Sequence, residues 1–205
     1  SDAGGRALLP GFIDMHSHAD WTLPWKDHPK TLKWLVEQGV TTIVGGNCGI
    51  SPAPMNRAAI GKTEILATMF IEDKMDYSWE TMDQYLSAMN EVDPIVNLAE
   101  MVGHATLHYN AQSQSLRKMD DDSLKDALDL ARQSLNDGAC GLSFGLGYDP
   151  GMFTSQDELA EYCKVAAEAD KPVAIHMKAL SKISPCYPLT TLSAHNLLAL
   201  KEAIE

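Results

Sequence analysis

Segment 10–20, Pro-Gly-Phe-Ile-Asp-Met-His-Ser-His-Ala-Asp, indicates both the fold and the chemistry of this chain. A short apolar run leads there into two histidines that are one residue apart. If residues 11–18 form a β-strand, alternate side chains share a face, so His16 and His18 point to the same side. Neutral imidazoles are good ligands for zinc and similar divalent ions. The segment therefore predicts half of a metal site, although the same spacing also occurs by chance in loops.

The rest of the chain alternates apolar, β-branched runs with amphipathic helix patterns. Further strands are predicted at 40–46, 94–103, 139–147 and 171–178. Helices are predicted at about 29–38, from Ser78 onward, after the triple aspartate 120–122, at 155–169 and from 194 onward. Residues 51–78 have the composition of a long loop with one short helix near 63–70.

Five strands that alternate with helices imply a parallel sheet with right-handed crossovers. An open doubly wound sheet and part of a (β/α)8 barrel both fit that pattern. The barrel is favoured because barrel enzymes gather their functional groups at the carboxyl ends of strands, where this chain places His16, His18, Cys48, His104 and His176. No Gly-x-Gly-x-x-Gly fingerprint follows the first strand, so a dinucleotide-binding fold has little support.

Two of these strand-end residues have a structural interpretation beside the functional one. Cys48 lies in the turn Gly45-Gly46-Asn47-Cys48-Gly49, where a thiolate could reach a metal, whereas a core cysteine more often lies inside a strand. His104 could line a substrate pocket, yet a histidine at a strand end can equally be a hydrogen-bonded structural residue. The residues alone leave both alternatives open.

Composition and charge narrow the class of protein. The chain has 205 residues, of which 45% are hydrophobic, and a formal net charge of −12, which argues against nucleic acid and anionic membranes as partners. It contains no apolar run of membrane-spanning length, and its first residues resemble neither a signal peptide nor a transit peptide, so we expect a cytoplasmic protein. The four cysteines are widely spaced and predict no disulfide framework or zinc ribbon.

Five segments carry a resemblance to a known family. They are Pro-Gly-Phe-Ile-Asp-Met-His-Ser-His (10–18), Gln-Gly-Val-Thr-Thr-Ile-Val-Gly-Gly-Asn-Cys-Gly-Ile-Ser (38–51), Val-Gly-His-Ala-Thr-Leu (102–107), Gly-Leu-Ser-Phe-Gly-Leu-Gly-Tyr-Asp-Pro-Gly (141–151) and Ile-His-Met-Lys (175–178). Together they resemble the amidohydrolase superfamily, and most closely its D-aminoacylase branch, the N-acyl-D-amino-acid deacylases.

This resemblance implies a metal site and a partial fold. It implies His16, His18, Cys48 and His176 as ligands of one or two zinc ions, with Cys48 in the place usually held by a carboxylated lysine. A thiolate can bridge two ions, which explains a soft ligand among imidazoles. The implied fold is roughly the first five βα units of a TIM-type (β/α)8 barrel, so that residues 1–205 form the N-terminal part of the catalytic barrel. Strands 6–8 and a small β-sandwich domain would be absent.

The implied reaction is zinc-assisted hydrolysis of the linear amide of an N-acyl-D-amino acid, a small-molecule substrate. The family's general-base aspartate is expected beyond Glu205, so no residue here is a certain catalytic base and the 205-residue chain alone is expected to be inactive or nearly so. His104 is a candidate substrate-binding residue. His108 and Lys178 stand where the family commonly has arginine, and both changes bear on substrate specificity.

Two other functions fit parts of the pattern. A cyclic amidase of the dihydroorotase or hydantoinase type would share the barrel and the His-x-His pair, but Cys48 argues against it because those sites normally use the carboxylated lysine. A non-catalytic α/β binding module would make the histidines structural. A half-open barrel also leaves a strand edge and apolar helix faces uncovered, so we expect self-association of the chain.

Overall fold

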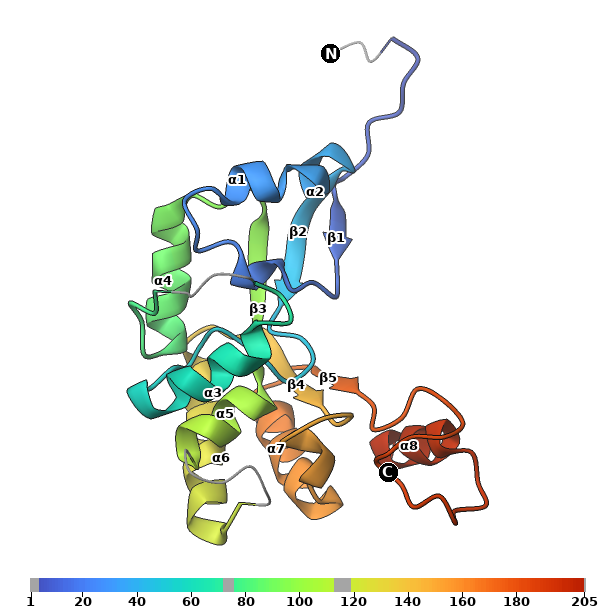
Figure 1. The fold of residues 1–205 in the computed structure, drawn as a ribbon. Coiled ribbons are helices and arrows are strands. Elements are labelled where there is room, and N and C mark those ends of the chain that lie inside the picture. Colours follow the sequence, from blue (N-terminus) through green and yellow to red (C-terminus); the bar gives the residue numbers. More distant parts are fainter. Residues whose placement is uncertain (1–3, 72–75, 113–118, 205) are drawn as a thin grey trace.

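The computed structural model describes residues 4–71, 76–112 and 119–204, and its centre is a sheet of five parallel strands (Figure 1). The strands are β1 (Phe12–Asp14), β2 (Val40–Gly45), β3 (Asn97–Gly103), β4 (Gly141–Gly145) and β5 (Val173–His176). They lie in chain order, and each pairs in parallel with the next along the chain.

Helices connect every pair of neighbouring strands. The 3-10 helix η1 (Ala19–Trp21) and the short helices α1 (His28–Thr31) and α2 (Lys33–Glu37) lead from β1 to β2. Two helices precede β3 and two follow it: α3 (Arg57–Ala67), α4 (Met82–Val92), α5 (His104–Ala111) and α6 (Asp121–Asn136). The 3-10 helix η2 (Gly151–Phe153) and α7 (Gln156–Glu168) follow β4, and α8 (His195–Ile204) follows β5.

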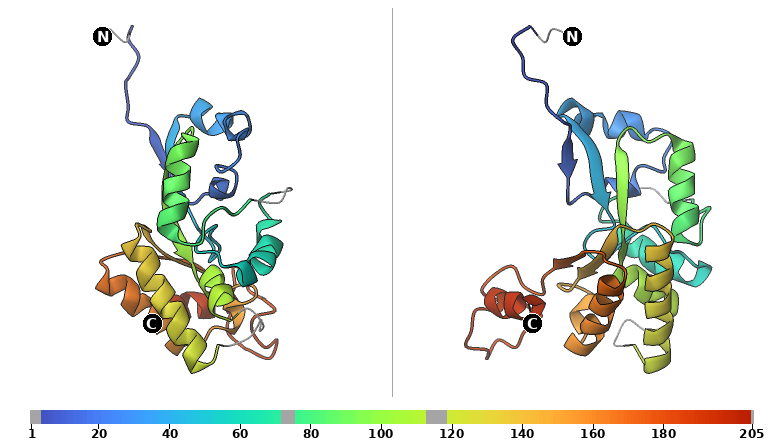
Figure 2. Two further views of the ribbon diagram at one scale, coloured as in Figure 1. Left: turned by 90° about the vertical axis from the view of Figure 1, so that its left-hand side faces the viewer. Right: turned by 180° about the vertical axis from the view of Figure 1, so that it is seen from behind.

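The strand order identifies the architecture. A doubly wound sheet reverses its strand order at a switch point, whereas here each strand lies beside its successor without reversal. The sheet curls along its length, and α8 lies to the side of it beyond β5 (Figure 2). The predicted partial TIM-type barrel is therefore confirmed.

Local sequence signals account for the helix starts. Asp120 and Ser155 cap α6 and α7 by accepting the backbone N–H groups of Ser123 and Glu158, at 2.8 and 3.2 Å. The helix predicted from Ser78 onward starts four residues later, at Met82. Thr81 caps α4 and forms a reciprocal capping box with Gln84.

Two predicted elements have different bounds in the structure, and one helix was not predicted. Strand β1 ends at Asp14, so His16 and His18 lie beyond it in a turn and do not alternate along a strand. The short helix expected near 63–70 is instead α3, which begins at Arg57 where Asn56 caps it. Helix α5 was not predicted. Part of the predicted loop 51–78, residues 72–75, lies outside the described residues.

The buried residues gather around strand β4 and the helices packed against it. Every residue of β4 is buried, and Ile43, Leu142, Phe144 and Tyr162 contribute to one continuous apolar core. The two edge strands are less buried than β4, since Phe12 on β1 is 62% exposed and all of β5 is half-buried. No helix among the described residues is both long enough and apolar enough to cross a membrane.

Candidate metal centre

The His-x-His pair follows β1 in a turn that runs beside β2. The Ser17 N–H donates to the Val44 carbonyl at 3.0 Å, and the His16 N–H donates to Asp14 Oδ1 at 3.1 Å. These bonds hold the turn at the carboxyl end of the sheet. His16 is exposed and His18 is half-buried, so the pair borders open space rather than the core.

Cys48 is carried by a tight turn after β2. Its own φ is +57°, and Gly46 before it has φ +66°, with a hypothetical Cβ only 1.9 Å from the Met101 carbonyl oxygen. Only glycine fits at that position. Ser143 on β4 fastens the turn, since its hydroxyl accepts the Gly49 N–H at 3.0 Å and donates to the Gly46 carbonyl. The sheet thus fixes the backbone that presents the thiol.

The structure brings together the four residues predicted as metal ligands. Cys48 Sγ lies 3.3 Å from His16 Nε2 and 3.6 Å from His176 Nδ1, although 128 positions separate Cys48 from His176 in the chain. Donor atoms of His16, His18 and Cys48 all lie within 4.8 Å of one another. Three strand ends therefore converge on one point.

Donor chemistry and spacing at this point both fit zinc. Neighbouring nitrogen and sulfur ligands of a tetrahedral zinc ion are roughly 3.5 Å apart, given Zn–N and Zn–S bonds of about 2.0 and 2.3 Å. The two distances from Cys48 Sγ bracket that value. The four side chains are exposed or half-buried, which leaves room for a further ligand such as water or substrate.

Burial and the nearby imidazole rings keep His18 and His176 in the neutral form that binds metal. Burial, reinforced by the nearby rings of His16 and His176, lowers the pKa of His18 to about 4. Burial, followed by the proximity of His16, also lowers the pKa of His176. Burial raises the pKa of the Cys48 thiol, so a cation is required to hold the thiolate at neutral pH.

Two aromatic residues that sequence reasoning missed support the centre. Phe70, just after α3, stacks on the His18 ring with a centroid separation of 3.9 Å and an angle of 13°. The Tyr148 hydroxyl donates to the Cys48 carbonyl, and its ring meets His176 edge-on at 5.4 Å. Tyr148 lies in segment 141–151, whose match to the family was the available signal. Nothing in the local sequence marks Phe70.

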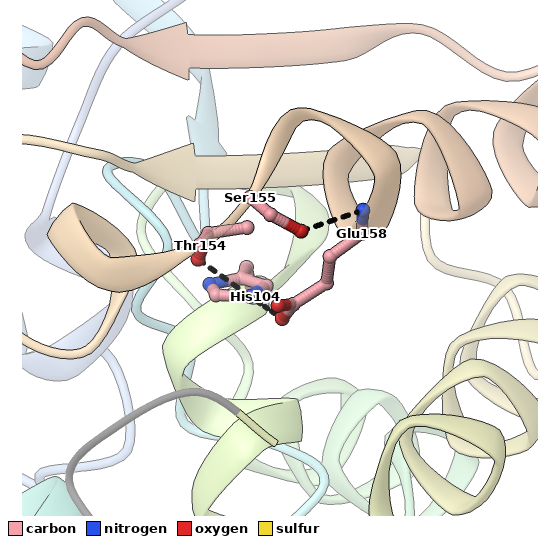
Figure 3. Close-up of polar contacts among 4 residues, drawn as sticks. All are labelled: His104, Thr154, Ser155 and Glu158. Atoms are coloured by element: carbon pink, nitrogen blue, oxygen red, sulfur yellow. Dashed lines mark hydrogen bonds and ion pairs between the residues drawn. The ribbon is translucent and has the colours of Figure 1, made fainter. Parts of the chain in front are cut away.

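His104 lies in a second, buried cluster that also contains His108 and Glu158. His104 Nε2 is 3.4 Å from both Glu158 Oε1 and Thr154 Oγ1, and the His104 side chain is only 1% exposed. Figure 3 shows His104 turned toward the first turn of α7. Its role as a substrate-binding residue stays a prediction.

A pair of buried carboxyl groups lies behind the Cys48 turn. Asp20 on η1 accepts the Gly46 N–H at 3.1 Å, and the Glu100 carboxyl group on β3 lies against Gly45 and Gly46. Burial raises the pKa of Asp20 to about 7 and holds the pKa of Glu100 well above its usual range. Sequence reasoning assigned neither residue.

A fold of this kind with metal-binding side chains at its strand ends is typical of metal-dependent barrel hydrolases. Comparison with known families agrees: the profile of the Amidohydrolase family matches residues 1–150. The chain therefore belongs to the amidohydrolase family, and its predicted resemblance to the D-aminoacylase branch is confirmed.

The chain is also similar to individual proteins of this family. The chain is 34% identical over 179 residues to D-aminoacylase from Alcaligenes xylosoxydans xylosoxydans, covering 86% of this chain and 35% of that protein. A crystal structure of D-aminoacylase superposes with a TM-score of 0.76 at 31% identity, covering 94% of this chain and 37% of that one. An N-acyl-D-glutamate deacylase from Bordetella bronchiseptica, solved with zinc and a phosphonate mimic of the tetrahedral intermediate, gives 0.76 at 28% identity, covering 95% and 37%. The chain thus spans about a third of the length of these relatives.

Proposed function

We propose that the protein to which this chain belongs is a zinc-dependent amidohydrolase that cleaves the linear amide of N-acyl-D-amino acids. One observation carries the proposal: Cys48 Sγ lies within 3.6 Å of imidazole nitrogens from two different strand ends. The relatives named as D-aminoacylase and N-acyl-D-glutamate deacylase support the substrate class. A dihydroorotase-type site gains no comparable support, because a thiol occupies the place of its carboxylated lysine.

His16, His18, Cys48 and His176 would hold one or two zinc ions. When bound, zinc would polarise the amide carbonyl and make water a better nucleophile at neutral pH. The chain's own residues would prepare the site for it. His18 and His176 are kept neutral, Phe70 fixes the plane of the His18 ring, and Tyr148 holds the backbone of Cys48.

The remaining assignments extend this proposal to the whole protein. Residues 1–205 would be the N-terminal part of the catalytic barrel, in line with the 37% of the D-aminoacylase structure that the chain covers. The general base would come from another part of that barrel, so the 205-residue chain alone would have little or no activity. A cytoplasmic location is supported by the four cysteines, all of which are free.

Substrate contacts are the least constrained part of the proposal. His104 is retained as a candidate, and its 1% exposure means that it could act on substrate only through a neighbouring group. Lys178, by contrast, is at the carboxyl end of the sheet just past β5, with its amine 3.5 Å from Glu202 Oε2. A lysine there could bind a substrate carboxylate once released from Glu202.

The activity is tested on the full-length protein with N-acetyl-D-amino acids, their L-enantiomers and dihydroorotate. We expect hydrolysis of the D-substrates, loss of activity on chelation and recovery with zinc. The matched 205-residue chain, assayed beside it, should be inactive or nearly so. Preference for dihydroorotate, or no hydrolysis by zinc-loaded protein, would reject the proposal.

Self-association of the chain is proposed from the same geometry. Strands β1 and β5 are the two ends of the sheet, and Phe12 and Ile13 on β1 are 62% and 58% exposed. Unpaired strand edges bearing apolar side chains favour pairing with a second copy. Sedimentation of the 205-residue chain should show mass that rises with concentration, and a monomer at all concentrations would contradict this.

A further inference from the structure

The buried cluster at the start of α5 has the composition of a metal site. His104 and His108 are four residues apart on α5, a spacing that places both imidazoles on one side of a helix. Glu158 comes from the first turn of α7, and Figure 3 shows it beside His104. Donor atoms of the three residues lie within 4.8 Å of one another, and the side chains are 1%, 2% and 5% exposed.

Distances inside the cluster suit a shared cation better than a direct hydrogen bond. His104 Nε2 and Glu158 Oε1 are 3.4 Å apart, longer than the roughly 2.9 Å of a usual N–H···O bond. Neighbouring nitrogen and oxygen ligands of a tetrahedral zinc ion are also about 3.4 Å apart, given bonds of about 2.0–2.1 Å. Thr154 Oγ1 is a further oxygen, again 3.4 Å from His104 Nε2.

Burial adds an independent reason for a positive charge at this place. Phe144 and Tyr162 pack against the His104 ring with centroids 5.4 and 5.2 Å away, so the surroundings of the cluster are largely apolar. Within the described part of the chain, the one ion-pair partner of Glu158 is His104. Over the same residues, His104 Nδ1 is buried without a hydrogen-bond partner. A carboxylate buried in such surroundings is costly unless it is paired or coordinates a metal ion.

We propose that His104, His108 and Glu158 bind a divalent cation of the zinc class in a closed structural site, distinct from the centre around Cys48. Two imidazoles and a carboxylate are a common zinc donor set, and closed sites take up their ion as the chain folds. The ion would join α5 to α7. It would also brace the Cys48 turn, because the Ala105 N–H donates to the Gly49 carbonyl at 2.8 Å.

Zinc retention by variants of the protein tests this site separately from the proposed function. The double variant His16→Ala/Cys48→Ala removes the other centre, and it should still retain one zinc per chain and melt at a higher temperature with zinc than with chelator. Adding His108→Gln should weaken that zinc affinity more than about 10-fold, since even outer partners of ligands cost this much. Glu168→Gln, which changes an exposed glutamate on α7, the helix that carries Glu158, is the control and should change nothing. No zinc in the double variant, or retention despite His108→Gln, would overturn the proposal.

Cobalt spectra of the unaltered protein give a reading that does not depend on variant folding. Cobalt at the Cys48 centre should show sulfur-to-metal charge transfer, whereas cobalt bound by His104, His108 and Glu158 should show only ligand-field bands. A second equivalent of cobalt without the thiolate band supports the site. Uptake that saturates with thiolate-bound cobalt alone counts against it.

Discussion

The centre around Cys48 and the cluster around His104 use similar residues in opposite surroundings. At the Cys48 centre His16 is exposed and its three partners are half-buried, whereas the side chains of His104, His108 and Glu158 are at most 5% exposed. Catalytic metal sites keep a coordination position open and structural sites close around the ion. Exposure, more than residue type, therefore separates a site suited to hydrolysis from one suited to stabilising the barrel.

The two sites also differ in how they are assembled. Cys48 and His176 meet across 128 positions because parallel strands align their carboxyl ends, while His104 and His108 meet because four residues make about one helical turn. An open site built from several strand ends can shift its ligands relative to one another. In the buried cluster, two of the three side chains come from one helix, so the helix fixes the spacing between them.

The largest effect is expected from His104→Ala at the buried cluster. This change removes a buried ring and leaves Glu158 as an uncompensated carboxylate, so we expect a loss of about 3–5 kcal/mol in the free energy of unfolding. Chemical denaturation with and without chelator measures it. Arg132→Ala is the control, because its ion pair with Asp129 is on the surface and such pairs contribute about 0–1 kcal/mol. A loss below about 1 kcal/mol for His104→Ala would mean that the cluster does not stabilise the fold.

Cys48→Ala should affect metal binding at the open centre more than stability. Loss of the one sulfur donor of the centre should weaken zinc there by about 100-fold or more, since even supporting partners of ligands cost 10–100-fold. Competition with a chromophoric chelator measures the affinity. Cys140→Ala, also half-buried but at the start of β4, should leave it unchanged. Equal affinities in the two variants would remove Cys48 from the ligand set.

Sequence predicted the sheet and the four converging side chains because both depend on strand order and strand ends. It placed His16 and His18 on a strand because a turn held beside β2 by one bond, from the Ser17 N–H to Val44, leaves no trace in periodicity. Helix α5 was missed for a related reason. Its first six residues, His104 to Tyr109, are all buried, so the segment lacks the polar face that identifies a helix.

Contacts between side chains far apart in the sequence could not be predicted from local patterns. Phe70 reaches His18 from just past the C-terminal end of α3, and Glu158 reaches His104 from α7, 54 positions later. Neither contact follows from local spacing. The capping serine at 155 was predicted, but the same first turn of α7 also directs Glu158 into the core, and only packing shows that.

The buried carboxyl group of Glu100, which has no histidine partner among the described residues, should make the stability of the protein depend on pH. Glu100 is enclosed by Asp20 on η1, Tyr85 on α4 and Cys140 before β4, and burial is the largest cause that raises its pKa. The folded protein then keeps a proton that the unfolded chain releases above about pH 4.5, so stability falls as pH rises from there. Glu100→Gln removes this dependence. Between pH 5 and 7 the unaltered protein should lose more stability than the variant, by at most about 1.4 kcal/mol per pH unit for this one proton. Parallel curves from denaturation at several pH values would show that Glu100 ionises normally in the fold.

The smallest effect is expected from Phe70→Ala, which touches the open centre without supplying a ligand. The Phe70 ring stacks on His18 at 3.9 Å and restricts its rotation, so removing it should cost zinc affinity only about 3–10-fold, at or below the lower end of the range for supporting partners. Met69→Ala is the matched control, because that neighbouring side chain is 57% exposed. If Phe70→Ala weakened zinc as much as Cys48→Ala does, the open centre would depend on ring orientation as strongly as on its sulfur donor, and the distinction between ligands and supporting side chains there would fail.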